Sequence, residues 1–555
     1  MCGIIGLLGR EDRALVDRMG QRIAHRGPDG DGVWTDRDVT LGHRRLSIID
    51  ISGGAQPMES HDGRYCIVYN GEVYNHQALR ETLESAGHVF RSDHSDTEVL
   101  LEGFRAWGDG LPGRLEGMFA FAIWDTLERS LFIARDPFGI KPFFYACAGE
   151  DWIFASEQKA LFAHPDLKAV PNLDRIKERA ALEFLTGQGT LFEGVHQLPP
   201  GSMATVRPGP GPCQVAWQPY YQVAHESFTS IESAAHAIRE RFVQSVDEQL
   251  MADVPLGVIL SGGLDSAAVA AVHQTLLSDT PIKTFTIAES QDVDDFRHAR
   301  RLAEDLGTDH HESFFDLDMV VGDLPRYTWH NENINYTEFF FQPLFANMAK
   351  HVKVGLCGQG SDELWGGYGR YREPLALARQ RIERIRSANP RHAERLTTEI
   401  AMTHSSGSSL AEYDQLGGQL NNFQLRLVDR NSMASSLEVR VPFLSKPLHQ
   451  ASRALSWGLK LHDGVEKWIL RKALEDVGLP HDLVWRPKVP AGRATGPWVM
   501  ERFEAQAAKL AGGKTPAGLE GTFSVPAEAL LYRLWHEVFV ERDGNLRGLA
   551  LEDLA

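Results

Sequence analysis

A Pro- and Gly-rich stretch without hydrophobic periodicity, residues 198–219, separates two parts of the chain whose hydrophobic patterns differ. Before it, short apolar runs are bounded by Gly, Asp or Pro, as β-strands are; they lie at residues 4–9, 65–71, 118–125, 130–136 and 143–146. Between these runs, apolar residues recur with helical spacing at 75–87 and 97–108. The first part is therefore predicted to be a β-rich domain with a few helices.

In the second part, apolar strands alternate with helices. The predicted order is a strand at 254–260, a helix at 266–277, a strand at 282–287 and a helix at 294–307. Such alternation indicates an α/β fold with a parallel sheet covered by helices. Beyond about residue 370 the pattern is mainly helical. We therefore predict two domains, at residues 2–200 and 226–555, joined by a linker at 201–225.

The composition excludes several classes of protein. Asp and Glu number 75 against 57 Lys and Arg, a net charge of −18, whereas a nucleic-acid-binding protein needs a basic surface. No apolar run is long enough to span a bilayer, and the first residues lack the basic region of a secretory signal. The five cysteines form no Cys-x-x-Cys pair, which favours reduced thiols. We expect a cytoplasmic enzyme that binds neither nucleic acid nor a membrane.

Cys2 is a candidate nucleophile because it follows the initiator methionine directly. If Met1 is removed, one residue carries both a thiol and a free α-amino group. An α-amino group has a pKa of roughly 7.7–8.0, so it is partly neutral near pH 7 and can accept the thiol proton. The position alone is a weak signal, since a cysteine at position 2 is usually incidental.

Cys2 begins a series of segments that resembles the class II glutamine amidotransferase domain over nearly 200 residues. The segments are MCGIIG, HRGPDG (25–30), HRRLSIID (43–50), YNGEVYN (69–75), SDTE (95–98), GMFAFAIWD (117–125) and ARDPFGIKPFFY (134–145). The resemblance implies a four-layer αββα fold of the N-terminal-nucleophile type. In such a domain Cys2 would attack the side-chain amide of glutamine, form a thioester and release ammonia.

The resemblance also implies roles for further residues. Asn70, through its side-chain amide, and Gly71, through its backbone N–H, would donate to the developing oxyanion. The planar guanidinium of Arg45 would pair with the α-carboxylate of glutamine, and two carboxylates would hold its α-ammonium. The implied catalytic residues are Cys2, Asn70 and Gly71, and the implied glutamine-binding residues are Arg45, Leu46, Asn70, Glu72 and Asp96.

In the second domain, residues 254–271 read as a strand, a Gly-rich turn and a helix, an arrangement suited to binding an anion at the helix N-terminus. The turn lacks the GK[ST] ending of a Walker loop. SGGLDS (261–266) instead resembles the pyrophosphatase loop of ligases that split ATP into AMP and pyrophosphate. The resemblance implies that ATP or pyrophosphate is bound by Leu260, Ser261, Gly262, Gly263, Asp265, Ser266, Ile287, Cys357, Gly358 and Lys467, and Mg²⁺ by Asp265 and Asp362.

Both domains in this order, followed by RVPFL and EKWILR, resemble the glutamine-hydrolysing asparagine synthetase family over nearly the whole chain. The resemblance implies that ATP activates a carboxylate as an acyl-adenylate and that an internal tunnel delivers ammonia from the first domain. Ammonia then displaces AMP to form an amide. Glutamine, ATP and an acceptor, with aspartate preferred, are the expected substrates, and the family makes a homodimer plausible. The domains are then a glutaminase at 2–200 and an ATP-pyrophosphatase at 226–555.

The chain departs from the family at the position of the ammonia attack, where Gln359 stands in place of an acidic residue. Glutamine cannot take a proton at working pH, and general base catalysis is typically worth ~10² to 10⁴ in rate. In the segment implicated in aspartate binding, the counterparts are Tyr336 and Phe339, neither of them cationic. Three readings remain open: another group is the base, the acceptor is a different carboxylate on a peptide, cell-wall precursor or secondary metabolite, or the synthetase site is impaired.

His310, His311 and Glu312 could suggest a metal site. Adjacent residues of a strand point to opposite faces of the sheet, so the two histidines cannot easily reach one ion. We predict that they are structural.

Overall fold

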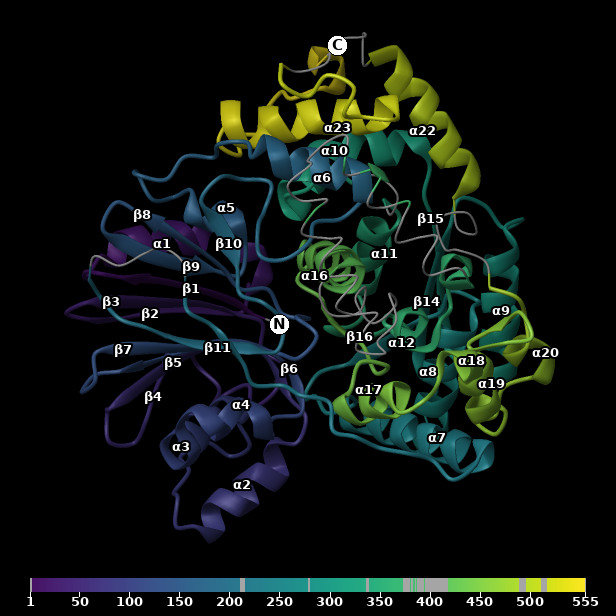
Figure 1. Ribbon diagram of the computed structural model, residues 1–555, viewed down its shortest axis with the longest axis horizontal. Helices are drawn as coiled ribbons and strands as arrows, with labels where there is room; N and C mark the ends of the chain where they lie inside the picture. Colours follow the sequence, from purple (N-terminus) through teal and green to yellow (C-terminus); the bar gives the residue numbers. More distant parts are fainter. Residues whose placement is uncertain are drawn as a thin grey trace.

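The computed structural model describes residues 2–209, 215–277, 280–335, 339–372, 418–488, 496–510 and 517–554, together with isolated positions between 373 and 417. Two bodies lie side by side, an antiparallel β-sandwich and an α/β domain (Figure 1). No helix in the described ranges is long and apolar enough to cross a membrane.

The first domain contains two six-stranded sheets. In strand order, the first sheet contains β10 (Val195–Gln197), β8 (Phe144–Ala148), β9 (Asp151–Ala155), β1 (Gly3–Leu8), β3 (Val39–Arg45) and β2 (Gly30–Asp36). The second contains β12 (Gln218–Pro219), β11 (Ser202–Val206), β7 (Ser130–Arg135), β6 (Gly117–Asp125), β5 (Tyr65–Val73) and β4 (Met58–Glu59). The strand pairs within each sheet are antiparallel, and the two sheets pack face to face over a buried apolar core that includes Ile4, Val68 and Trp124.

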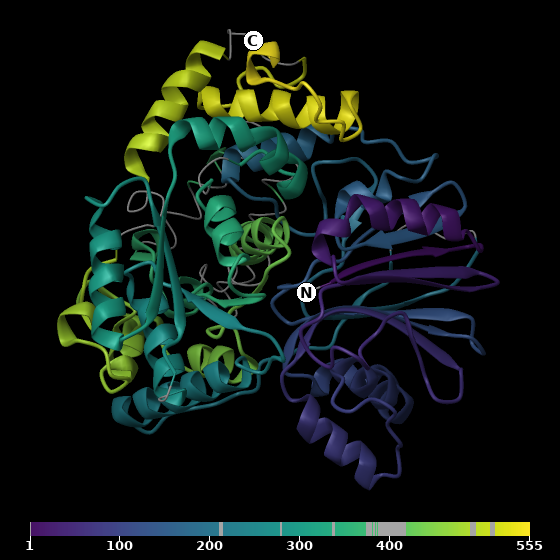
Figure 2. The ribbon, with the colours of Figure 1, turned by 180° about the vertical axis from the view of Figure 1, so that it is seen from behind.

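Helices cover the outer face of each sheet (Figures 1 and 2). The first sheet carries α1 (Arg13–Arg22) and α5 (Gln158–Leu161), whereas α6 (Leu173–Leu182) lies beside α10 (Leu317–Asn331) of the second domain. The second carries α2 (His76–Ser85), α3 (Asp96–Trp107) and α4 (Leu111–Arg114). α3 lies on β5 because Leu100 and Leu101 are buried against Ile67 and Phe121. The four-layer αββα arrangement predicted for this domain is confirmed.

The predicted linker at 201–225 contains part of this domain. β11 lies within it and pairs with β7, with Met203 opposite Ala134 and Val206 opposite Leu131. The strand is short and is flanked by Pro and Gly, so the sequence pattern does not distinguish its apolar residues from the aperiodic stretch. The boundary at residue 200 therefore cuts through a sheet.

The second domain is built on a five-stranded parallel sheet in the order β15–β14–β13–β16–β17. Its strands are β13 (Leu256–Ile259), β14 (Lys283–Ala288), β15 (Asp309–Phe314), β16 (Val354–Leu356) and β17 (Glu438–Arg440). The chain moves outward from β13 to β15 and then crosses back to β16. The strand order thus reverses between β13 and β16, and ligands of open α/β sheets bind outside the carboxyl ends of the strands at such a point.

Helices cover both faces of this sheet (Figure 1). α8 (Leu264–Leu276) and α9 (Asp294–Leu306) lie on one side, and α11 (Phe341–Met348) and α16 (Arg426–Met433) on the other. The outer helices are α7 (Ile231–Glu248), α10 (Leu317–Asn331), α17 (Lys446–Arg453), α19 (Trp468–Leu474), α22 (Pro497–Leu510) and α23 (Pro526–His536), and the short ones are α12 (Ser361–Trp365), α18 (Trp457–Lys460) and α20 (His481–Val484). The mainly helical C-terminal region is confirmed for the described residues.

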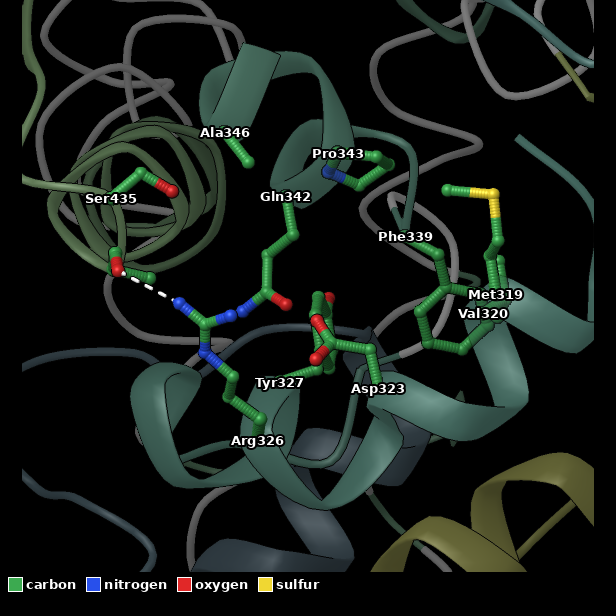
Figure 3. Close-up of a pocket in the computed structure, with 11 residues that line it drawn as sticks. Met319, Val320, Asp323, Arg326, Tyr327, Phe339, Gln342, Pro343, Ala346 and Ser435 are labelled. Atoms are coloured by element: carbon green, nitrogen blue, oxygen red, sulfur yellow. Dashed lines mark hydrogen bonds between the residues drawn. The ribbon is translucent and has the colours of Figure 1, made fainter. Parts of the chain in front are cut away.

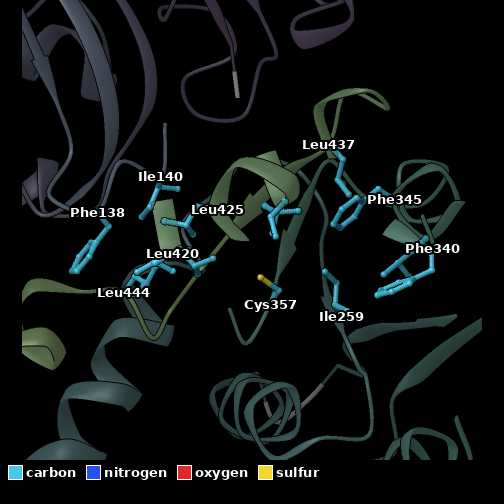
Figure 4. Packing of buried hydrophobic residues seen from close by; sticks show 14 of the residues in the cluster. Phe138, Ile140, Ile259, Phe340, Phe345, Cys357, Leu420, Leu425, Leu437 and Leu444 are labelled. Atoms are coloured by element: carbon cyan, nitrogen blue, oxygen red, sulfur yellow. The ribbon is translucent and has the colours of Figure 1, made fainter. Parts of the chain in front are cut away.

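The apolar core continues across the domain interface. Figure 4 shows Phe138 and Ile140 of the first domain on the same side as Leu420 and Leu444 of the second, and all four belong to one buried cluster. Apolar burial is worth roughly 25 cal/mol per Å², so a shared core of this kind holds the two domains in a fixed relation.

Candidate active sites

Cys2 lies just before β1, buried between the two sheets and the second domain. Its backbone N–H donates to Asn70 Oδ1 at 2.9 Å, and its thiol lies 3.9 Å from the carbonyl oxygen of Leu46. Burial raises the pKa of the Cys2 thiol above its ordinary value. A base within reach is therefore needed to form the thiolate, and the α-amino group of the same residue meets that need once Met1 is removed.

Asn70 and Gly71 lie near the end of β5, beside Cys2. The Asn70 side chain is fully buried, and its Nδ2 group has no hydrogen-bond partner although its Oδ1 is engaged. An unsatisfied buried donor costs about 1–3 kcal/mol, so it is retained where a ligand completes it. At Gly71 a Cβ would collide with the carbonyl oxygen of Met118, so only glycine fits the close approach to β6. The two donors predicted for an oxyanion are thus placed together.

The predicted glutamine-binding residues surround this point. Arg45 ends β3, and its guanidinium donates to the backbone carbonyls of residues 49, 50 and 51 at 3.3, 2.7 and 2.8 Å. These bonds fix the guanidinium against the loop that follows β3. Asp96 starts α3, where its Oδ2 accepts from the Tyr69 hydroxyl at 2.8 Å and the Val73 N–H at 3.2 Å.

Glu72 lies on β5 at the domain interface and is nearly buried, with one oxygen 3.7 Å from Arg440 and the other without a partner. Burial and the nearby carboxylate of Glu438 raise the pKa of Glu72 well above its usual range, and burial raises that of Asp96. A ligand ammonium between the two carboxylates would reverse these shifts.

The SGGLDS loop connects β13 to α8 at the point where the strand order reverses. The Ser266 hydroxyl accepts from the Ser261 N–H at 3.0 Å and lies 2.9 Å from the Ser261 hydroxyl, which closes the turn. Gly262 has a φ of +74°, and a Cβ there would collide with the Asp295 carbonyl. Gly263 caps α8, so the first N–H groups of that helix face the loop.

The loop after β16 lies against the same helix. A Cβ on Gly358 would lie 2.6 Å from the Cβ of Asp265, so the two loops touch through this glycine. Cys357 is buried, and burial raises the pKa of its thiol to about 12, so it is no nucleophile at neutral pH. Ile287, one residue before the end of β14, is 7% exposed.

Carboxylates and ammonium groups alternate where the two loops meet. Lys467 Nζ lies 2.7 and 2.6 Å from the two oxygens of Asp265 and 2.6 Å from Asp362 Oδ1. Lys488 Nζ lies 2.8 Å from Asp362 Oδ2 and 3.7 Å from Asp265. Although burial works against it, Lys467 and Lys488 hold the pKa of Asp362 well below its usual range. Likewise, Asp362, Asp265 and Glu363 raise the pKa of Lys488 against the effect of burial.

The structure thus brings together Asp265, Asp362 and Lys467, which the resemblance had implied. Lys488 was missed. It follows α20 in a segment without periodicity, and no motif identified it. Among the described residues, no group of three or more His, Cys, Asp or Glu could hold a metal ion. Two carboxylates are nevertheless enough for Mg²⁺, which keeps several waters and takes further oxygens from phosphates.

Gln359 follows Gly358 and donates through Nε2 to Gln424 Oε1 at 2.8 Å. Tyr336, one of the two counterparts in the segment implicated in aspartate binding, lies outside the described residues. Phe339 is buried, and its ring packs edge-on to Tyr327 and Phe503 with centroids 5.2 and 4.9 Å apart.

Phe339 also lines a pocket of about 210 Å³ between α10, α11 and the end of α16, with Arg326 and Gln342 at its polar side (Figure 3). Phe339, which stands in the segment implicated in aspartate binding, thus forms part of the wall of this pocket.

Arg440 and the paired histidines have structural partners. Arg440 is fully buried; it donates to Glu438 at 2.6 Å and to the carbonyls of Gln249 and Met251, so it faces the domain interface rather than the SGGLDS loop. His310 lies 2.8 Å from the Thr284 hydroxyl, and His311 stacks on Phe285 at 4.8 Å. The prediction that the histidines are structural is consistent with these contacts.

A buried ion pair joins the two domains beside Cys2, and sequence reasoning missed it. Arg26 Nε donates to the Cys2 carbonyl at 3.0 Å, and its two terminal nitrogens donate to the two oxygens of Asp429 on α16 at 2.9 and 3.0 Å. Arg26 also donates to Glu157 at 2.9 Å. Arg26 lies in the HRGPDG motif, but its partner is 403 residues away in the chain, so no local pattern connects them.

Comparison with known proteins identifies both domains. Residues 1–220 match the family model of the glutamine amidotransferase domain, and residues 237–539 match that of asparagine synthase. Glutamine-hydrolysing asparagine synthetase 1 of Bacillus subtilis is 32% identical over 88% of this chain and 86% of its own length, and synthetase 3 of that organism is 34% identical with the same coverage. A putative asparagine synthetase of Mycobacterium tuberculosis is 31% identical over 98% of both chains. The chain belongs to the glutamine-hydrolysing asparagine synthetase family.

Proposed function

We propose that this protein converts aspartate to asparagine with ATP and glutamine, through a β-aspartyl-adenylate and with release of AMP and pyrophosphate. The observation that carries the proposal is the alternating cluster of Asp265, Lys467, Asp362 and Lys488 at the carboxyl ends of β13 and β16. It lies beside an anion-binding loop, in the same chain as a buried cysteine with an unsatisfied amide donor next to it.

In the first domain, Cys2 is the nucleophile that attacks the amide carbon of glutamine. Asn70 Nδ2, which has no hydrogen-bond partner among the described residues, and the N–H of Gly71 receive the oxyanion. Arg45, fixed by three carbonyls, takes the α-carboxylate, and Glu72 and Asp96 take the α-ammonium. Leu46 contributes the carbonyl that lies near the thiol.

In the second domain, the SGGLDS loop and the N-terminus of α8 hold the departing pyrophosphate. The ammonium groups of Lys467 and Lys488 offset its charge, and each is released from its carboxylates as phosphate oxygens replace them. Asp265 and Asp362 would hold Mg²⁺, a hard cation that prefers oxygen ligands and that would polarise the phosphates when bound. The two carboxylates suit this ion because both lie 2.6 Å from the same ammonium group, Lys467 Nζ, and so face one point beside the loop.

Ammonia passes between the sites inside the protein. It would otherwise protonate in water at pH 7 and lose its nucleophilic lone pair. A small cavity of about 10 Å³ lies at the interface, lined by Ile140 and Phe144 from the first domain and Asn421 and Arg430 from the second. A passage would have to widen from this point, by movement of the side chains that line it.

A second candidate keeps the chemistry and changes the acceptor to another carboxylate, such as one on a peptide or a secondary metabolite. Gln359 in place of an acidic residue favours it, and so does the burial of Phe339 where a cation was expected to bind a carboxylate. The two candidates share the glutaminase, the loop and the lysines, so they differ only in the acceptor.

The test uses aspartate labelled with ¹⁸O in its β-carboxylate, together with MgATP and an ammonium salt. Ammonia breaks the bond between the acyl carbon and the bridging oxygen, so an adenylate intermediate predicts one ¹⁸O atom in AMP. AMP without label, formed together with asparagine, would contradict the adenylate. Absence of aspartate-dependent pyrophosphate release would contradict aspartate as the acceptor, and the same assay with other carboxylates would then test the second candidate. Asp265→Asn is the control that should stop pyrophosphate release while glutaminase activity remains.

A further inference from the structure

A chain of hydrogen bonds leads from Gln359 to a buried carboxylate. Gln359 Nε2 donates to Gln424 Oε1 at 2.8 Å, and Gln424 Nε2 donates to the Tyr368 hydroxyl at 3.3 Å. The Tyr368 hydroxyl in turn donates to Glu363 Oε1 at 2.9 Å. Glu363 is fully buried and lies on α12, in the loop region that also supplies Asp362. These hydrogen bonds thus connect two separate segments, residues 359–368 after β16 and the helix Leu420–Leu425 that holds Gln424.

The hydrogen bonds themselves fix the direction of the chain. The Tyr368 hydroxyl donates to Glu363 Oε1, so its oxygen is left to accept from Gln424. Gln424 then presents its NH₂ group to Tyr368 and its carbonyl to Gln359. Gln359 must therefore present its NH₂ group to Gln424, which leaves its Oε1 facing away from the chain. An amide without such a chain would be able to adopt either orientation.

We propose that Gln359 positions the incoming ammonia by accepting one of its N–H bonds, and that Glu363 sets the required amide orientation through Tyr368 and Gln424. The inference rests on the proposed function and on the resemblance to the family, which implies that Gln359 stands where ammonia attacks. With Oε1 forward, the nitrogen lone pair stays free to attack. With the amide reversed, its NH₂ group would donate to that lone pair and block it. Gln359 holds the nucleophile in this account and takes no proton from it.

The chain of hydrogen bonds would change direction if Gln359 were replaced by the acidic residue that the family usually has there. In Gln359→Glu the new carboxylate only accepts, so Gln424 must turn its NH₂ group toward position 359 and its carbonyl toward Tyr368. The Tyr368 hydroxyl then donates to Gln424 instead of Glu363. The direction of the chain reverses, and Glu363 no longer controls the residue at position 359.

The experiment measures pyrophosphate release with aspartate, MgATP and ammonium salt, so that the glutaminase is bypassed. Tyr368→Phe removes one bond of the chain and keeps the ring, and Gln424→Met removes the acceptor for Gln359. Each should raise the KM for ammonia by about 3- to 10-fold, the value of one hydrogen bond, and leave the KM for ATP unchanged. A loss of packing alone would instead lower kcat with both KM values unaffected, or change both KM values together.

A double-mutant cycle gives the decisive result. Tyr368→Phe should raise the KM for ammonia in the wild-type background and change it by less than 2-fold in Gln359→Glu, where the tyrosine no longer sets the orientation. An equal effect in both backgrounds, or no effect in the wild type, would overturn the inference while the synthetase remains active. If the wild type releases no aspartate-dependent pyrophosphate, the proposed function fails and the inference fails with it.

Discussion

Replacement of Arg26 by methionine tests whether the buried pair with Asp429 holds the domains together. The guanidinium of Arg26 is fully buried, and it is the group that donates to both oxygens of Asp429. Methionine has a similar length and no donors. The variant therefore leaves a buried carboxylate on α16 and an unbonded carbonyl on Cys2, whereas Glu157 keeps Lys159 and Arg430.

The expected cost follows from the burial of both partners. Removal of one partner of a buried ion pair destabilises a protein by about 3–5 kcal/mol, because the other charge stays buried without compensation. For a domain of this size such a loss lowers the urea midpoint of unfolding by on the order of 1 M. Arg26→Met combined with Asp429→Asn should recover most of the loss, since the uncompensated charge is gone.

The matched control is Arg22→Met, four residues earlier. Arg22 pairs with Asp543, whose side chain is 65% exposed, and exposed pairs contribute about 0–1 kcal/mol. Urea unfolding followed by tryptophan fluorescence compares the midpoints of the two variants. A midpoint for Arg26→Met as high as that of the control would refute the reasoning.

The loss of stability in Arg26→Met also depends on pH, and the direction of the change follows from the pKa of Asp429. In the wild type, Arg26 keeps the pKa of Asp429 below its ordinary value against the effect of burial, so the stabilisation is present at neutral pH and is lost as the pH falls through that lowered pKa. In Arg26→Met only the charges of Lys141 and Arg430 still oppose the effect of burial, so the pKa of Asp429 rises relative to the wild type. The deficit of the variant should therefore shrink between pH 7 and pH 5, and an equal deficit at both pH values would contradict the assignment.

Three further outcomes are expected. Cys2→Ala should abolish glutamine-dependent synthesis and spare ammonia-dependent synthesis, and loss of both would contradict two separate sites. Asn70→Ala should lower the kcat of glutamine hydrolysis by about 10² to 10³ with a smaller change in KM, because the unsatisfied Nδ2 donor acts on the transition state; a change in KM alone would assign Asn70 to substrate binding. Lys488→Met should raise the KM for ATP and slow pyrophosphate release without affecting glutamine hydrolysis, whereas Lys350→Met, a control at the end of α11, should change neither.

Local patterns were sufficient for much of the fold. The strands and helices around residues 65–136 and 254–307 were predicted within a few residues, because apolar periodicity and Gly or Asp boundaries mark each of them. The residues proposed for the two sites came instead from the resemblance to the family, since a cysteine at position 2 and a Gly-rich turn between a strand and a helix are each weak evidence alone. The position where the strand order reverses followed only from the structure.

Residues whose roles depend on distant partners could not be predicted. Arg26 needs Asp429, Lys488 needs Asp362, and Gln359 needs Gln424, at separations of 403, 126 and 65 residues. Periodicity reports which face of an element is buried and carries no information about which buried polar groups meet. The strand β11 was missed for a different reason, since its pairing with β7 outweighs the Pro and Gly on either side.

The most direct test of the account combines both sites in one reaction. Purified protein is incubated with MgATP and glutamine labelled with ¹⁵N in the amide, with and without aspartate, and pyrophosphate and the ¹⁵N content of the products are measured. The account predicts aspartate-dependent pyrophosphate and ¹⁵N-asparagine in equal amounts. Glutamate and labelled ammonia without aspartate-dependent pyrophosphate would contradict it.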